Sequence, residues 1–360
     1  MLALKQEKFL LLALIVALVA YPLEHTLLNM GQTPALIGAV VLIGAILLAA
    51  LRVAHHAEVL AEKKVGEPYG TMILTLSAVL VEVVILAIML SHAPSPTLMR
   101  DTVYSAVMLD INGILGLAAI LGGLKHGEQP YNLDSGNTYV VMILTAMGVS
   151  MIVPEFIPEP HWRAWSVFTI IVMVVMYAMF LRLQTGKHSY FFNYKYGSKH
   201  GHAEEEGEHG NVKASAAIMI AGLVLIGVLA EAMAVLLDSG LKGTGVPPIT
   251  AALVVAVISA SPEILTALRA ALGNRMQGVV NIALGASLST VILTVPVIEG
   301  LALIRGEPIF MALTPVQTVM ALLTLLAAAI NLHDGETNAI EGLTHFVLFA
   351  AFLMLAAIGV

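Results

Sequence analysis

Two glutamates stand within long apolar stretches of this 360-residue chain. Glu82 lies within residues 71–90 and Glu263 within residues 249–270. A carboxylate at membrane depth is costly, so such residues usually face a protein cavity and handle ions or protons. Two of them in related segments predict one shared cation site.

Oxygen-bearing side chains accompany both glutamates at helical spacing. Thr75 falls on the face of the first glutamate and Ser259 on the face of the second. Ser261 precedes Pro262. The proline is expected to deny that serine helical geometry, to loosen the helix and to free a backbone carbonyl. Hydroxyl and carbonyl oxygens of this kind would help to bind a cation, although serine and threonine hydroxyls also bond to their own helix backbone.

The helices that follow each glutamate carry rows of polar residues. One row contains Asn112 and the other Asn281. Carboxylate, amide, hydroxyl and carbonyl oxygens suit Ca²⁺ or Na⁺, whereas Zn²⁺ or Cu⁺ favours imidazole or thiolate. Asp110 lies away from the Asn112 row and is either a coupling or gating group or a locally satisfied acid. Glu231 leaves the same two alternatives open.

Cations and protons compete for buried carboxylates. Burial favours the protonated form of an empty site, and a bound cation favours the ionised form. One divalent ion against two protons keeps the pair neutral in both states, which avoids about 2.3 kcal/mol per uncompensated charge at 100 mV. A purely structural acid pair would want a basic partner at the same depth, and none is present there. The pair therefore predicts an exchanger.

The composition is that of an integral membrane protein. Hydrophobic residues make up 59% of the chain and charged residues 11%, which leaves too little polar surface for a water-soluble domain. The net charge is −7 and the basic residues form no stripe, so a nucleic-acid partner is not expected. The absence of cysteine excludes disulfides and thiolate chemistry.

We expect an all-α polytopic membrane protein with eleven transmembrane helices, since apolar runs of this length cross a bilayer as helices. Their approximate cores are residues 9–23, 34–51, 71–91, 102–124, 138–154, 164–183, 213–237, 247–269, 277–303, 310–331 and 340–360. The first run is interpreted as a retained helix rather than a secretory signal, because no clear cleavage site follows it.

An internal repeat organises the chain. A shift of 181 residues places residues 66–82 over 247–263 and aligns the two glutamates, and residues 101–117 match 274–290 at a slightly different offset. Each half would hold five helices, so the second half enters from the opposite side, as in many secondary transporters. The predicted parts are an extra first helix (1–30), a first repeat (31–183), a cytoplasmic His/Glu-rich loop (184–212) and a second, inverted repeat (213–360).

The distribution of positive charge predicts the orientation. The predicted inner loops hold 13 of the 17 lysines and arginines. By the positive-inside rule the amino terminus is cytoplasmic and the carboxyl terminus is outside.

Several motifs resemble one family. These are Arg52–Ala57 (RVAHHA), residues 66–70 (GEPYG) leading into Ser77 and Glu82, residues 97–102 (TLMRDT), Ser261–Glu263 (SPE) and Leu293–Pro296 (LTVP). Together they resemble the cation/Ca²⁺ exchanger superfamily, and within it the bacterial calcium/proton and sodium/proton antiporters of the ChaA type.

The resemblance implies a multi-pass transporter of the bacterial inner (plasma) membrane, not an enzyme, that exports Ca²⁺, Na⁺ or K⁺ against protons. It implies Glu82 and Glu263 as the central carriers, with Ser77 beside the first, and no cofactor; a homo-oligomer is left open. One departure bears on ion choice. Residues 79–82 read Val-Leu-Val-Glu, where many calcium/proton exchangers have Gly-Asn-x-x-Glu.

Other interpretations stay open. Sodium-driven calcium exchange would want more charged and oxygen ligands than the two glutamates provide, and a passive cation channel would not need a protonatable pair. An intramembrane metalloenzyme should show His-Glu-x-x-His, which is absent. Histidine and glutamate in residues 184–212 either bind divalent cations weakly or form a solvated linker.

Overall fold

The computed structural model describes residues 7–64, 69–92, 97–186, 188–194, 212–306 and 309–359, without the side chains of residues 58, 61–64, 69–75 and 90–92. Residues 66–68 and the side chains of residues 69–70 of the GEPYG segment, the side chain of Thr75 and most of the His/Glu-rich loop therefore lie outside the described residues.

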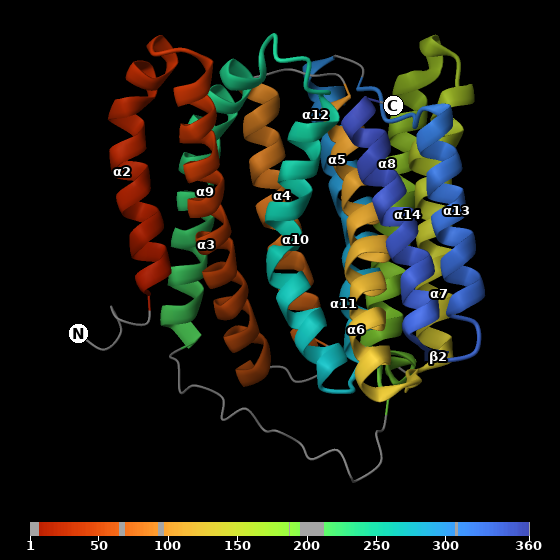
Figure 1. The fold of residues 1–360 in the computed structure, drawn as a ribbon. Coiled ribbons are helices and arrows are strands. Elements are labelled where there is room, and N and C mark those ends of the chain that lie inside the picture. The colour runs from red at the N-terminus through yellow and green to blue at the C-terminus, as the bar shows by residue number, and fades with distance from the viewer. Residues whose placement is uncertain are drawn as a thin grey trace. The chain divides into compact units, whose positions relative to one another are not determined.

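The described chain is almost entirely helical (Figure 1). The first half contains α2 (Lys8–Asn29), α3 (Gln32–Lys64), α4 (Tyr69–His92), α5 (Leu98–Val107), η1 (Met108–Leu115), α6 (Gly116–His126), β1 (Gln129–Pro130), α7 (Leu133–Met147), η2 (Gly148–Ile152), η3 (Val153–Phe156), η4 (Glu159–His161), α8 (Trp162–Thr185) and η5 (Ser189–Phe192). The second half contains α9 (Val212–Leu241), α10 (Ile249–Leu272), α11 (Met276–Ser289), η6 (Thr290–Thr294), α12 (Val295–Arg305), α13 (Pro315–Asn331), β2 (Glu336–Thr337) and α14 (Ala339–Ile358).

The predicted fold class is confirmed. Nine described helical segments are long and apolar enough to cross a membrane. Two shorter apolar segments, Leu76–Met89 and Pro315–Asn331, complete the expected eleven. The tenth helix begins at Pro315 rather than at residue 310, because Thr314 caps it by accepting a bond from the Gln317 amide.

Two of the long helices contain a π-helical turn in their middle. Helix 4, formed by α5, η1 and α6, contains η1, and helix 9, formed by α11, η6 and α12, contains η6. The 181-residue shift that aligns the glutamates also places residues 109–113, which belong to η1, over residues 290–294, which form η6. The repeat therefore continues through this helix pair at the same offset, rather than at the different one expected from the residue types.

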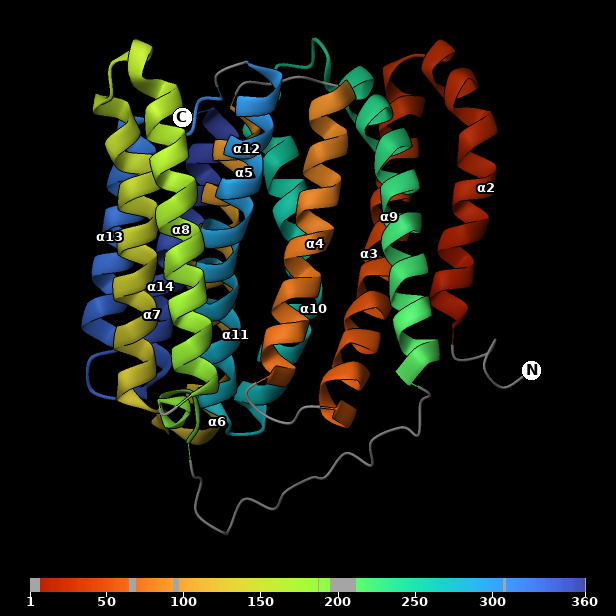
Figure 2. The same ribbon diagram turned by 180° about the vertical axis from the view of Figure 1, so that it is seen from behind.

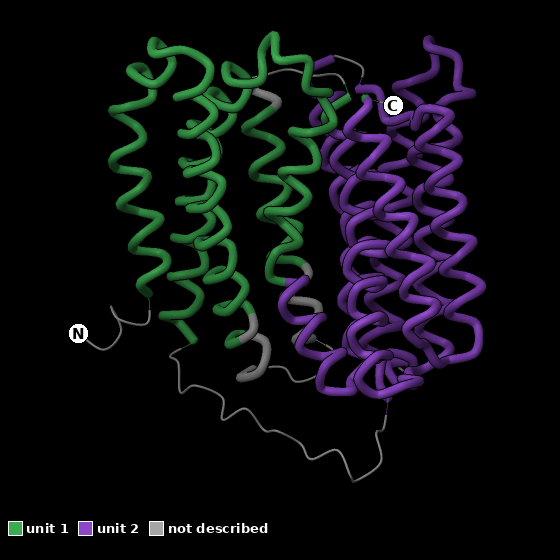
Figure 3. Tube along the Cα trace, in the orientation of Figure 1, with its two compact units in different colours: residues 1–98, 207–262, 359 green, residues 99–206, 263–358, 360 purple. Residues whose placement is uncertain are grey.

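The chain forms two compact units (Figure 3). Unit 1 comprises residues 1–98, 207–262 and 359, and unit 2 comprises residues 99–206, 263–358 and 360. Each unit combines helices from both predicted repeats. The boundary divides α10 between Pro262 and Glu263.

In unit 1, α3 and α9 lie side by side (Figures 1 and 2). A Cβ at Gly240 would lie 2.7 Å from the Leu36 side chain, and a Cβ at Gly222 would lie 2.6 Å from that of Val53. Residues late in α9 thus meet residues early in α3, so these equivalent helices of the two repeats are antiparallel. Glycine at the contacts allows the close approach.

In unit 2, helices 4 and 9 are likewise antiparallel. Lys125 Nζ, near the end of helix 4, donates at 2.9 Å to the carbonyl oxygen of Leu272, the last residue of α10 and four residues before helix 9 begins, and Ser287 Oγ of helix 9 donates to Asp110 Oδ2 at 3.1 Å. Asp110 precedes Lys125 by as many residues as Ser287 follows Leu272. The predicted inversion of the second repeat is therefore confirmed in both units. A two-stranded ladder that pairs Gln129 with Thr337 was not expected from the sequence.

Candidate cation-binding site

Glu82 lies near the middle of α4, in unit 1. Its side chain is 1% exposed, and it is surrounded along the helix by buried Val81, Ile85 and Leu86. Ser77 is also buried, at 4% exposed, whereas Leu80 on another face is 48% exposed. The carboxylate thus belongs to the buried face of the helix, as expected for an ion-handling residue.

The second motif lies on α10, which remains helical through Pro262. The expectation that the proline denies Ser261 its helical geometry is therefore wrong. Proline cannot donate to the carbonyl four residues earlier, that of Ile258. Ser261 Oγ supplies the missing donor to this oxygen at 2.9 Å, so the helix continues.

Ser259 and Glu263 lie one turn apart on the same helix. Their side chains are 8% and 5% exposed. Ser259 Oγ donates to the carbonyl of Ala256 at 3.0 Å. Because a hydroxyl that donates its proton to the backbone keeps its oxygen lone pairs, both serines can still present an acceptor to a cation.

Asn112, predicted as an ion ligand, lies in η1 and is fully buried. Its Nδ2 donates to Thr324 Oγ1 of α13 at 2.7 Å, and its Oδ1 pairs with His345 Nδ1 of α14 at 3.0 Å. Near the start of helix 4, Asp101 accepts a bond from Gln317 of α13 at 3.0 Å. The polar row of helix 4 thus fastens it to α13 and α14.

Asn281, the other amide in the predicted set, lies in α11. Its Oδ1 accepts a bond from Gln277 at 2.8 Å and its Nδ2 donates to the Phe192 carbonyl at 2.8 Å. Gln277 also donates to Ser135 Oγ at 3.0 Å and accepts from the Asn132 amide at 2.7 Å. The polar row of helix 9 thus fastens it to α7 and η5.

These two rows are equivalent under the repeat, because the fifth and tenth helices correspond. Each row has a side-chain amide bond to the fourth helix of the other half, which is α13 for helix 4 and α7 for helix 9. The ion-ligand role of Asn112 and Asn281 stays a prediction, and the bonds give both amides a packing role.

Asp110 faces a different neighbour from Asn112. It is 2% exposed and accepts the bond from Ser287 of α11. Glu231, on α9, is exposed. The separation of Asp110 from the Asn112 row, expected from helical spacing, is therefore present, and its role in coupling stays a prediction.

Sequence reasoning missed two ionisable side chains inside apolar helices. His345 of α14 is 2% exposed and Glu299 of α12 is 4% exposed. Both could have been found, since an ionisable residue within a membrane span is a functional candidate by default. In the described part of the chain, no three side chains of His, Asp or Glu converge as a metal site.

Comparison with known proteins gives a consistent assignment. The family model described as sodium/calcium exchanger protein matches residues 34–186 and 214–358. The putative ionic transporter y4hA of Sinorhizobium fredii is 31% identical over 94% of this chain and 92% of its own length. The sodium-potassium/proton antiporter ChaA of Escherichia coli is 33% identical over 86% of each chain.

The fold has solved counterparts. A structure of the Ca²⁺/H⁺ antiporter protein YfkE matches with a TM-score of 0.73, covering 96% of this chain and 99% of that chain at 16% identity. The H⁺/Ca²⁺ exchanger CAX matches with a TM-score of 0.65, covering 96% of this chain and 88% of that chain at 16% identity. With the family model matching most of its length, the chain belongs to the sodium/calcium exchanger protein family.

Proposed function

We propose that this protein exchanges a cation for protons across the membrane, with Glu82 and Glu263 as the two carriers. The observation that carries the proposal is the burial of both carboxylates, at 1% and 5% exposed, at equivalent positions of an inverted repeat. Family membership supports transport, and one relative 33% identical to this chain is named a sodium-potassium/proton antiporter.

The exchange follows from competition at the carboxylates. With no cation bound, desolvation favours their protonated forms, and a bound cation favours their ionised forms. Ser77, Thr75, Ser259 and Ser261 would supply further oxygens from the same two helices. Carboxylates that hold either a cation or protons, but not both, couple the two fluxes without a second device.

The cation is Ca²⁺, Na⁺ or K⁺ in this proposal, because all of these bind hard oxygen ligands. The sodium-potassium/proton antiporter ChaA of Escherichia coli is 33% identical to this chain, whereas a Ca²⁺/H⁺ antiporter of Aphanothece halophytica is 24% identical. Residues 79–82 read Val-Leu-Val-Glu and lack the Gly-Asn-x-x-Glu pattern of many calcium/proton exchangers, which also weakens the expectation of strict calcium selectivity.

We further propose a location in the bacterial inner membrane with the amino terminus cytoplasmic and the carboxyl terminus outside. The concentration of lysine and arginine in one set of loops supports this orientation. The lipid bilayer, protons and inorganic cations are then the partners, and no resident cofactor is required.

The test uses everted vesicles that contain the protein and have an interior made acidic by respiration. Ca²⁺, Na⁺ or K⁺ is added separately while a dye reports the pH gradient. Antiport predicts that at least one cation collapses the gradient in a saturable manner, and that vesicles without the protein do not respond. Calcium uptake that requires a sodium gradient and leaves the pH gradient intact would instead show sodium-driven calcium exchange. Cation movement without proton movement would show a channel.

A further inference from the structure

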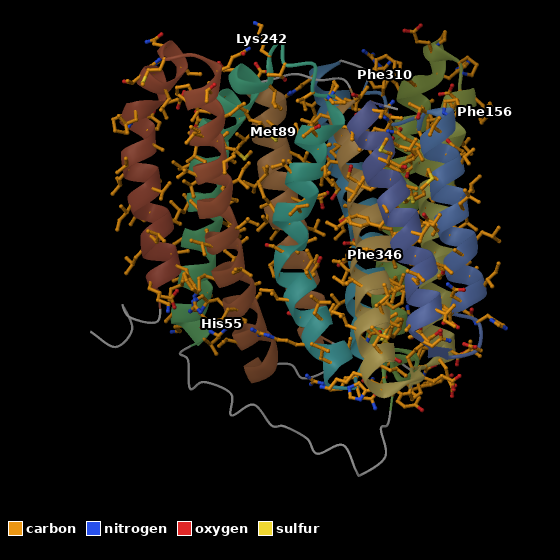
Figure 4. All side chains as sticks on the ribbon, viewed as in Figure 1. His55, Met89, Phe156, Lys242, Phe310 and Phe346 are labelled. Atoms are coloured by element: carbon orange, nitrogen blue, oxygen red, sulfur yellow. The ribbon has the colours of Figure 1, made fainter. Side chains whose placement is uncertain are left out.

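A cavity of about 410 Å³ lies within unit 2, where several helices end. The turns η3 and η4, the start of α8, the chain at residues 309–312 and Glu299 of α12 line it. Figure 4 places Phe310, which lines the cavity, at the same end of this unit as Phe156, which lies between the lining residues Glu155 and Ile157 in the sequence. Neither predicted carrier glutamate contributes to this cavity.

Glu299 presents a buried carboxylate to this cavity. The residue is 4% exposed, and its neighbours Ile298 and Ala302 on α12 are buried. Its Oε2 accepts no hydrogen bond from any described residue. A buried carboxylate oxygen without a partner carries a desolvation cost that a bound donor would remove.

Two indole rings lie in the same lining. Trp162 and Trp165 are the only tryptophans of the chain. The buried Nε1 of Trp165 donates to no acceptor within the described ranges. The guanidinium of Arg163 lies over the Trp162 ring, with its Cζ 5.4 Å from the ring centroid. One ring thus already receives a cation, as indole faces do.

The size and lining of the cavity select the kind of ligand. Glu155 and Glu159 also line it, yet among the residues that the structure places no three acidic side chains converge on a single point as metal ligands would. The volume falls in the range of small-molecule pockets, about 300–1,000 Å³. Apolar side chains of Ile157, Ile309 and Met311 complete the wall.

We propose that this cavity binds an organic cation: a primary ammonium or guanidinium group on a compact apolar body. The charged group donates to Glu299 Oε2, and the body packs on Trp162 and Trp165. An acceptor atom on the ligand would satisfy Trp165 Nε1. This is a binding site separate from the proposed Glu82 and Glu263 carriers.

The two tryptophans make the test direct, because all indole fluorescence of the protein arises at this cavity. The purified full-length protein in detergent is titrated with cyclohexylmethylammonium chloride, which does not absorb where tryptophan is excited. Cyclohexylmethanol, of nearly the same shape but uncharged, is the matched ligand control. We expect a saturable change of intensity or wavelength with the amine and a response at least about tenfold weaker with the alcohol, since bonds to charged groups are worth more than neutral ones.

The variant Glu299→Gln keeps the side-chain shape and removes the charge. We expect its midpoint for the amine to rise about ten- to a hundredfold, while Glu336→Gln, at an exposed position of β2, leaves the wild-type curve unchanged. No saturable response, an equal response to amine and alcohol, or an unchanged curve in Glu299→Gln would overturn the proposal. A response to CaCl₂ or NaCl in place of the amine would assign the cavity to inorganic ions and overturn it too. If Glu299→Gln does not fold, the comparison of amine with alcohol on the wild type decides.

Discussion

The Ser261 hydroxyl donates to the carbonyl oxygen of Ile258, 2.9 Å away, which is the acceptor that Pro262 leaves without an amide donor. The hydroxyl takes the place of the missing amide donor and keeps α10 helical immediately before Glu263. It also ties a side chain of the proposed ion-binding region to the backbone defect that the proline creates. A serine hydroxyl is easily displaced, so this turn can open at a smaller cost than an ordinary helical turn.

We predict that Ser261→Ala lowers the unfolding free energy of the protein, and that adding Pro262→Ala restores it. In the single variant the buried Ile258 carbonyl loses its donor, which costs about 1–3 kcal/mol of unfolding free energy. In the double variant the new amide at residue 262 bonds to that carbonyl. Thermal unfolding in detergent measures the stabilities of the four proteins in the cycle.

Exchange activity provides the second measurement for the same cycle. We expect the stable double variant to remain impaired in exchange, because a regular helix presents neither the serine oxygen nor a loosened turn. A double variant with full activity would show that the hydroxyl and the proline serve stability alone. The variant Ser215→Ala, a buried serine on α9, controls for the loss of a serine as such.

The sequence predicts what depends on local composition. The eleven spans follow from hydropathy, and the inversion follows from the odd number of helices per repeat. The sequence could not predict which residues the polar rows contact, since Asn112 meets Thr324 only because α13 packs on helix 4. The same is true of Asp110 and Ser287, which lie on helices of different repeats. Spacing shows which side chains share a face, and packing decides what that face contacts.

The proposed carriers are tested by Glu82→Gln and Glu263→Gln. Glutamine keeps the shape and loses both the charge and the titratable proton, so we expect each variant to show no cation-dependent collapse of the pH gradient in everted vesicles. Glu336→Gln, at an exposed position of β2, should retain wild-type exchange. Full exchange in either carrier variant, at normal levels of folded protein, would disprove the assignment of that residue.

The buried amide cluster is tested by Thr324→Val. This change is nearly isosteric and leaves Asn112 Nδ2, which donates to Thr324 Oγ1 at 2.7 Å, without that acceptor. We expect a loss of about 1–3 kcal/mol in unfolding free energy. Thr344→Val removes the acceptor of an exposed bond from Asn331, 2.9 Å long, and should cost within about 0.5 kcal/mol. Equal losses in the two variants would refute a special role for burial.

A pH-dependent contribution is expected from Glu7, which joins α2 to α3. Burial pushes its pKa upward, but the charge and hydrogen bonds of Arg52, with contributions from His56, outweigh burial and hold the pKa below its ordinary value of 4.5. The distances to Glu7 Oε1 are 2.5 Å from Arg52 Nη2 and 3.1 Å from His56 Nε2.

Because the folded-state pKa is lowered, the stabilisation is present above the unfolded-state pKa and is lost as pH falls through the folded-state value. We therefore predict that Glu7→Gln is less stable than the wild type near neutral pH, and that the gap narrows below about pH 4.5. Unfolding temperatures measured across this range test it. Glu24→Gln, near the other end of α2, is the control. A gap that is constant with pH would exclude the ion pair as its source.

The contact between helix 4 and α14 depends on two glycines. A Cβ added at Gly342 would lie 2.6 Å from the backbone nitrogen of Ile120 and 2.7 Å from the carbonyl oxygen of Gly116. Backbone atoms cannot rotate away as a side chain can, so Gly342→Ala must push the helices apart and disturb the bond from His345 to Asn112 one turn further along. We expect a loss of about 1–3 kcal/mol from overpacking. Gly300→Ala on α12, where a Cβ would meet nothing within 4 Å, should be neutral or slightly stabilising. Thermal unfolding of both variants measures the difference, and equal stabilities would show that the helices separate without cost.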